Sequence, residues 1–214
     1  MEKQTTYSSS LSSVAEDLFV ELFCDVFGPE KTQYLSIQYP VVDNYGGDRR
    51  SFKYFKEETV KKYATQYKWE LITPANMKDK FIEMVETMDM SFSYKPVLLK
   101  AMFEHVDENG RVRVEDIVDY FIDFYTDRKN KGLVVEKKSC IYTKEGFTRK
   151  EVERNIFQNP FKRFEDMRFM KRSREIEHVE FSRHVFRKLT REEIGWILEH
   201  CDGRWGSIME RVPK

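Results

Sequence analysis

Basic and aromatic side chains concentrate in residues 147–189, and these are the residue types that bind the phosphates and bases of a nucleic acid. The segment contains 12 Lys or Arg, 7 Asp or Glu and 7 Phe. The whole chain balances 37 basic against 37 acidic residues, so the remainder holds 25 basic and 30 acidic residues. A basic segment on an otherwise acidic chain is typical of a protein that contacts a polyanion.

Nine cations of this segment are candidate phosphate contacts. Between residues 162 and 174, six cations meet only two anions, and such an imbalance is costly by self-repulsion unless a polyanion relieves it. Phosphate contacts would position the protein without reading sequence and would make its affinity strongly dependent on salt. The alternative is a solvated face in which glutamates pair with the cations. The candidates are Arg149, Lys150, Arg154, Lys162, Arg163, Arg168, Lys171, Arg172 and Arg174.

The seven phenylalanines of the segment are expected in the core, because a helix that exposed so many aromatic rings would be poorly soluble. Other groups that could do chemistry lack the necessary spacing. The run from Asp107 to Gly110 begins like a calcium loop, but Arg111 and Arg113 follow where oxygen ligands are needed. His178 and His184 are near no cysteine pair. We therefore predict no metal site.

Motifs that hold a nucleotide are absent from the sequence, which contains neither G-x-x-x-x-G-K-[ST] nor G-x-G-x-x-G. We therefore expect no cofactor and no ATPase activity of this chain on its own. Cys24, Cys140 and Cys201 are odd in number, lie far apart and form no C-x-x-C pair, which favours a reducing cytoplasm. No run approaches 18 consecutive apolar residues, and residues 1–13 lack the apolar core of a secretory signal, so we expect no membrane partner.

Residues 1–90 are expected to form a small helix–strand unit. Ser13 and Glu16 have capping-box spacing and predict a helix that ends near residue 28. Residues 33–42 alternate like a half-buried strand, and residues 57–67 favour a charged helix. An apolar stripe at helical spacing predicts a further helix over 77–88. The polar residues near 91 are the expected boundary between two domains.

Residues 91–214 have a clearer pattern. We expect a helix over 96–106, a strand over 111–114, a helix from 117 that ends at 127–129, and an extended segment over 133–142. Capping boxes at Thr148–Glu151 and Thr190–Glu193 predict helices that end near Asn159 and Gly203. A two-stranded ribbon is expected within 176–186. This order is that of a winged helix-turn-helix, so the predicted fold class is α+β and helix-dominated.

Two stretches resemble bacterial helicase-related proteins of the DEAD/DEAH-box, restriction-type superfamily 2. Residues 15–23 and 38–49 resemble the start of the nuclease-like unit that precedes the helicase motor. Residues 94–201, including the run 159–167, resemble the winged-helix-like tail that follows it. Relatives are ATP-dependent helicases, so the resemblance implies a nuclease-like start and a nucleic-acid-binding tail, with the motor missing.

The nuclease pattern is incomplete. Ser51, Phe52 and Lys53 stand where a metal-binding Asp is expected, and Glu70 is followed by Ile72 and Thr73 where a Lys is needed. The resemblance therefore predicts a truncated nuclease-like unit without its chemistry.

The sequence predicts a non-catalytic nucleic-acid-binding protein that is derived from, or accessory to, such a helicase, with DNA favoured over RNA. One alternative is a protein-interaction module that docks an acidic partner or a separate helicase motor subunit. A second alternative is a residual metal-dependent nuclease that uses Asp43, Asp48 or Glu70.

Overall fold

The computed structural model describes residues 72–88, 92–137, 139–173 and 175–209, with the backbone alone for 204–209, and also residues 21, 62, 64–66 and 68. The chain divides into two compact units, residues 1–72 and 73–214. The structural account below concerns the second, which we call the C-terminal unit. Of the helix expected from Ser13, only Glu21 is described, and it is helical. The strand expected over 33–42 and the truncated nuclease-like pattern lie outside the described residues.

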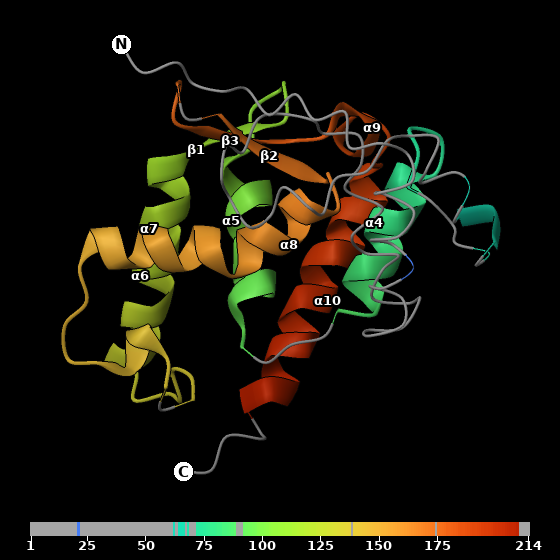
Figure 1. Ribbon diagram of the computed structural model, residues 1–214. Coiled ribbons are helices and arrows are strands. Elements are labelled where there is room, and N and C mark those ends of the chain that lie inside the picture. Colours follow the sequence, from blue (N-terminus) through green and yellow to red (C-terminus); the bar gives the residue numbers. More distant parts are fainter. Residues whose placement is uncertain are drawn as a thin grey trace. The chain divides into compact units, whose positions relative to one another are not determined.

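The C-terminal unit is helix-dominated and carries one small sheet, which confirms the α+β class (Figure 1). The strands of the described part are β1 (Arg111–Arg113), β2 (Met170–Ser173) and β3 (His178–Phe181). A short 3-10 turn, η2, spans Ile141–Thr143. The helices of the described part are α4 (Met77–Glu86), α5 (Tyr94–His105), α6 (Val114–Asn130), α7 (Arg149–Gln158), α8 (Pro160–Asp166), α9 (Arg183–Phe186) and α10 (Arg191–Met209).

The sheet is antiparallel with strand order β1-β3-β2, and it covers one end of the helices (Figure 1). Alternation along the strands sends apolar and charged side chains to opposite faces. Val112 and Val179 are paired in register and buried against the helices. On the outer face, Glu180 of the central strand stands between Arg111 and Lys171 of the two edge strands.

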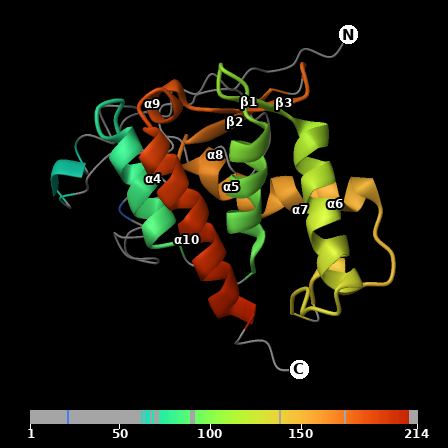
Figure 2. The ribbon, with the colours of Figure 1, turned by 180° about the vertical axis from the view of Figure 1, so that it is seen from behind.

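Helix α5 is the central element of the unit. It lies between α10 and α6 when the molecule is seen from behind (Figure 2). Five of its apolar residues are each at most 1% exposed: Val97, Leu98, Leu99, Ala101 and Met102. A helix with so broad an apolar face has to be enclosed by other elements.

Helix α4 packs with the C-terminal elements, although the sequence placed it before the expected domain boundary at residue 91. Phe81 is fully buried, and its ring centroid lies 6.4, 5.4 and 6.1 Å from those of Phe164, Phe169 and Phe181. The apolar stripe of α4 is therefore part of this core. The compact unit begins at Thr73, 18 residues before that expected boundary.

Several expected elements differ in detail. The ribbon is formed by residues 170–173 and 178–181, and the stretch from Arg183 is the short helix α9. The described residues of the segment 133–142 pair with no strand, and the segment runs into the 3-10 turn η2 at Ile141. Helix α10 continues through Gly203 to Met209, because a glycine costs a helix only about 1 kcal/mol relative to alanine. The capping boxes at Thr148 and Thr190 are both confirmed.

Replacing Phe81 by Ala should lower the free energy of unfolding of the C-terminal unit by about 3–5 kcal/mol, because a cavity opens among three other rings. Chemical denaturation of the full chain, followed by tryptophan fluorescence, measures the change. Leu133→Ala is the control, since Leu133 is 48% exposed and should change stability by less than about 0.5 kcal/mol. An equal effect of the two substitutions would show that α4 is not part of this core.

Candidate nucleic-acid interface

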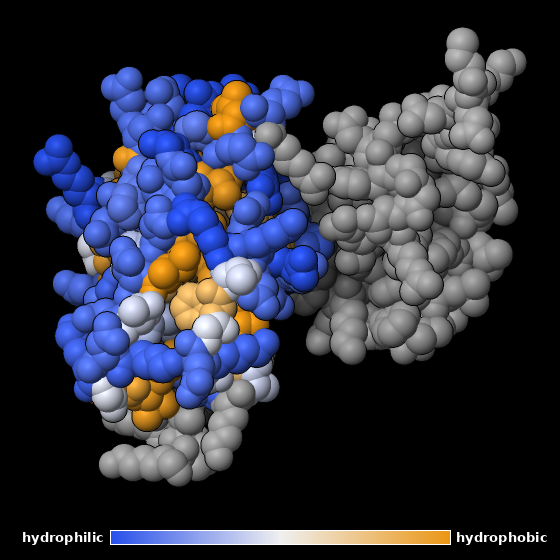
Figure 3. All heavy atoms as spheres, turned by 90° about the vertical axis from the view of Figure 1, so that its left-hand side faces the viewer, coloured by the Kyte–Doolittle hydropathy of each residue, from blue (hydrophilic) through white to orange (hydrophobic). Residues whose placement is uncertain are grey.

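Of the three predicted cations of α7, one forms an ion pair with an acidic residue and the other two are exposed to solvent. The guanidinium of Arg149 forms an ion pair with Asp119 of α6 and donates a 3.1 Å hydrogen bond to the Glu115 carbonyl. The hydrogen bond with Asp119 raises the pKa of Arg149. Lys150 and Arg154 are exposed. The face of the C-terminal unit seen in Figure 3 is mostly hydrophilic, with apolar patches between the hydrophilic residues.

The predicted cations of β2 point to opposite faces of the sheet. Lys171 is on the outer face, and its ammonium lies 2.6 Å from a carboxylate oxygen of Glu180. Arg172 is turned toward α7, where its guanidinium contacts Glu153 at 2.8 Å and lies over the ring of Phe157, 3.8 Å from the centroid. Arg172 is also 3.1 Å from Glu177, so it ties the ribbon to α7 rather than facing solvent.

The remaining candidates lie on and after α8. Lys162 forms an ion pair with Asp166 one turn later in the helix. Arg163 and Arg168 are half-buried and hold further contacts of their own. Arg174 lies outside the described residues.

The nine candidates therefore do not form one surface in the described part of the chain. Arg149, Lys162, Lys171 and Arg172 each contact a carboxylate. The alternative of a solvated face with acidic partners describes these four better than a phosphate-binding role does.

A different basic segment keeps its charge without carboxylate partners. Residues 181–191 hold four cations and His184, and they hold no Asp or Glu. The four cations are exposed, and none of them forms an ion pair with a described carboxylate: Arg183, Arg187, Lys188 and Arg191. Lys188 donates to the carbonyl of Pro74 at 2.8 Å, and Arg183 contacts the ring of His184 at 3.4 Å. A carbonyl and an imidazole ring carry no negative charge, so these contacts orient the two side chains without neutralising their positive charge.

The outer face of the sheet adds a positive row next to this segment. Arg111 and Lys171 both contact Glu180, at 3.2 and 2.6 Å, so two cations share one anion. Burial disfavours the ionised carboxylate of Glu180, but the hydrogen bonds and charges of Lys171 and Arg111 outweigh it, so the pKa of Glu180 is lowered. Glu180 therefore stays ionised at neutral pH, and the row has one positive charge in excess.

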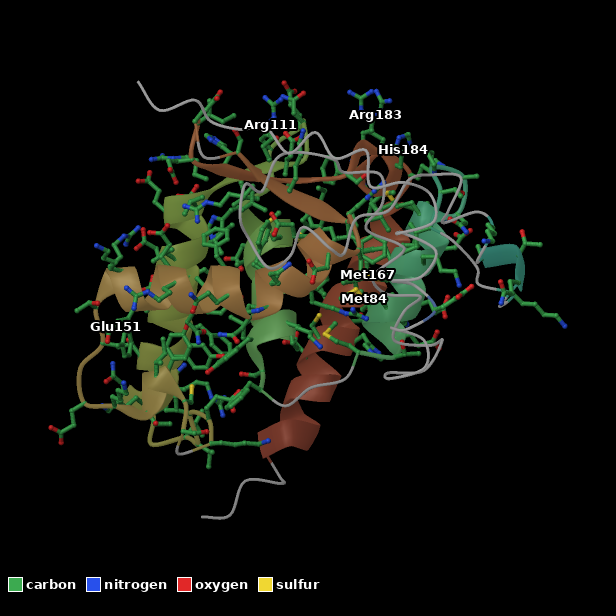
Figure 4. All side chains as sticks on the ribbon, in the orientation of Figure 1. Met84, Arg111, Glu151, Met167, Arg183 and His184 are labelled. Atoms are coloured by element: carbon green, nitrogen blue, oxygen red, sulfur yellow. The ribbon has the colours of Figure 1, made fainter. Side chains whose placement is uncertain are left out.

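Helix α9 is held against the sheet by both backbone and side-chain contacts. Ser182, its N-cap residue, donates its backbone N–H to the Phe169 carbonyl at 2.7 Å. The rings of Phe181 and Phe186 stack with centroids 5.9 Å apart. Arg111, Arg183 and His184 consequently lie on the same side of the unit, away from the helices (Figure 4). We use the name sheet–α9 surface for the cations of the outer sheet row together with those of α9 and the residues just after it: Arg111, Lys171, Arg183, His184, Arg187 and Lys188.

Sequence reasoning selected only Lys171 of these six residues. A signal for the others was present, because no acidic residue occurs between Glu180 and Glu192. The net charge of the whole segment 147–189 concealed this signal. A sum of charges does not show which cations have acidic residues beside them in the folded protein.

Asp107, Cys140 and Cys201 are three described groups whose surroundings bear on catalytic chemistry. Asp107 accepts the backbone N–H of Asn109 and of Arg111, both at 2.8 Å, as expected of a turn that ends a helix. No three His, Cys, Asp or Glu residues among the described positions could together hold a metal ion. Burial raises the pKa of Cys140, and it raises that of Cys201 to about 12, so both thiols are poor nucleophiles.

Comparison with protein-family models, with curated proteins and with solved structures returned no match to this chain. Among the described residues, no helix has the length and apolar character needed to cross a bilayer.

Replacing Glu180 by Gln should lower stability at pH 7 by about 1 kcal/mol or less. Because the folded-state pKa of Glu180 is depressed, the stabilisation exists above the unfolded pKa of about 4.3 and disappears as pH falls through the lower folded value. Thermal unfolding of both proteins from pH 7 to pH 3 measures the difference. Glu108→Gln, at an exposed position without an ion pair to a described residue, is the control. A stability difference between the wild type and Glu180→Gln that is the same at every pH would contradict a depressed pKa of Glu180.

Proposed function

We propose that this chain binds nucleic acid without hydrolysing it, and that the sheet–α9 surface makes the phosphate contacts. The observation that carries the proposal is the exposed run from Arg183 to Arg191, whose four cations face no described carboxylate. Folding has neutralised much of the basic charge elsewhere in 147–189 but not the charge of this run.

Polyanion binding fits such a surface for a thermodynamic reason. Each phosphate that a Lys or Arg neutralises releases condensed counterions, and this release supplies most of the non-specific affinity. A cation that is already paired must give up its carboxylate before it contributes, whereas Arg187 and Arg191 have no such partner among the described residues. The row formed by Arg111, Glu180 and Lys171 extends the positive field beside them.

The topology supports DNA as the preferred nucleic acid. Helix α5, strand β1, helices α6 and α7, and the hairpin of β2 and β3 follow the order of a winged helix-turn-helix, with the short helix α8 added between α7 and β2. The strand order β1-β3-β2 is compatible with that fold. In helix-turn-helix proteins one helix enters the major groove. Through the exposed Lys150 and Arg154, α7 would make a second contact with the DNA. The proposal includes an accessory role beside a helicase.

The charge-reversal variant Arg183→Glu, Arg187→Glu, Lys188→Glu should bind a 20-base-pair duplex at least about tenfold more weakly than the wild type. Fluorescence anisotropy at several salt concentrations measures both affinity and salt slope. The wild-type affinity should fall steeply between about 50 and 200 mM salt, and the slope should decrease by about 0.9 for each phosphate contact removed. Single-stranded RNA, tested in parallel, shows whether DNA is preferred.

The matched control is Lys129→Glu, Lys131→Glu, Lys144→Glu, which changes the net charge equally at exposed positions near the end of α6 that is remote from the sheet (Figure 1). It should retain most of the affinity. Lys150→Glu with Arg154→Glu measures the contribution of α7. An affinity that does not depend on salt, or equal losses in the first variant and the control, would refute the proposal. Binding to polyglutamate but not to duplex would assign the surface to an acidic protein.

A further inference from the structure

The aromatic rings beneath the sheet–α9 surface pack on one another. Phe181 is 3% exposed, and the rings of Phe103 and Phe186 stack on it with centroids 5.0 and 5.9 Å away. Phe169, whose carbonyl accepts the N–H of Ser182, is fully buried. These rings hold β3 and α9 in place, so their faces are occupied within the fold.

Gly110 fixes the position of the Phe186 ring. Its φ is +82°, in the left-handed region that favours glycine, and a Cβ built there would lie 2.9 Å from Cδ1 of Phe186. Its carbonyl also accepts the N–H of Phe181 at 2.9 Å. The half-buried ring of Phe186 is therefore packed against both Phe181 and the turn that precedes β1.

The groups that the surface exposes are cations rather than aromatic rings. No Phe, Tyr or Trp stands on the outer face of the described strands, whose residues are Arg111, Arg113, Lys171, Ser173, His178 and Glu180. Among the described side chains, Trp196 is the one Phe, Tyr or Trp that is exposed. It lies on α10, and its ring stacks on His200 with centroids 5.0 Å apart.

Single strands and duplexes require different surfaces. Proteins that bind single strands combine cations with aromatic side chains on which the bases stack, and each stacked base strengthens binding by about 5- to 150-fold. A duplex keeps its bases stacked inside and has the higher density of phosphate charge. Each phosphate contact consequently contributes about 0.9 to the salt slope on B-DNA, but only about 0.7 on a single strand.

We propose that the sheet–α9 surface selects double-stranded nucleic acid, which it binds through the phosphates, over single strands. The inference rests on the proposed function, because it names the form of nucleic acid that the same surface takes. Arg183, Arg187, Lys188 and the adjoining Arg191 face no described carboxylate. The row of Arg111, Glu180 and Lys171 adds one positive charge in excess, which gives about five phosphate contacts.

The number of contacts sets the expected preference. With about five contacts, the slope of log affinity against log salt should be about −4.5 for the duplex and about −3.5 for a single strand. Relative to 1 M salt, a slope difference of about one favours the duplex about tenfold at 100 mM salt. Stacked bases would remove this preference or reverse it, because a single strand can splay its bases onto aromatic rings and a duplex cannot.

Fluorescence anisotropy of the full chain with a 20-base-pair DNA duplex, and with each of its two separated strands, tests the inference. At about 100 mM salt the duplex should bind about tenfold more tightly, and its salt slope should be the steeper one. The ratio of the dissociation constants is measured on one protein sample, so the fraction of folded protein cancels. Arg183→Glu, Arg187→Glu, Lys188→Glu should move this ratio toward one, whereas Lys129→Glu, Lys131→Glu, Lys144→Glu should not change it.

Two ring substitutions test whether any base stacks on the protein. Phe186→Leu and Trp196→Leu should leave the ratio unchanged. Single strands that bind as tightly as the duplex would overturn the inference and leave nucleic-acid binding itself in place. Single-strand affinity that falls more than about fivefold in either ring variant, with duplex affinity retained, would also overturn it. A chain that binds neither form, or binds both independently of salt, would refute the proposed function and this inference with it.

Discussion

The packing of aromatic rings under the three-stranded sheet is the interaction on which the rest of the C-terminal unit depends. Strands of three or four residues are too short to form a stable sheet alone, so they need an apolar layer beneath them. Phe81 of α4, Phe164 of α8 and Phe181 of β3 supply that layer, and their ring centroids lie within 6.4 Å of Phe81. Because α9 follows β3 after one residue, the same packing also places the basic run from Arg183 on the surface.

Neutralisation through tertiary contacts decides which basic residues remain available for a ligand. Asp119 reaches Arg149 across 30 positions of sequence, and Glu153 reaches Arg172 across 19. These acids lie on neighbouring elements, so a segment with a large positive charge in sequence presents much less of it in space. The run from Arg183 differs because the contacts its side chains make with described residues are to a carbonyl of Pro74 and to its own His184.

Helix α10 closes the core of the C-terminal unit on one side only. Its inner side closes the core through Ile197 and Cys201, and ion pairs to α4 and α5 hold it there. Its outer side can therefore change in sequence without loss of the fold.

The sequence by itself determined the features that depend on neighbours within about one helical turn. The capping boxes at Thr148 and Thr190, the apolar stripe of α4 and the helix-dominated class all follow from such local spacing. The burial of Phe161, Phe164, Phe169 and Phe181 was also predicted, because a soluble helix cannot expose so many rings. Only the tertiary structure decided that α4 belongs to the C-terminal core, where the ribbon pairs, and which cations find acidic partners. Each of these depends on side chains that are distant in sequence and adjacent in space, and no local pattern records that adjacency.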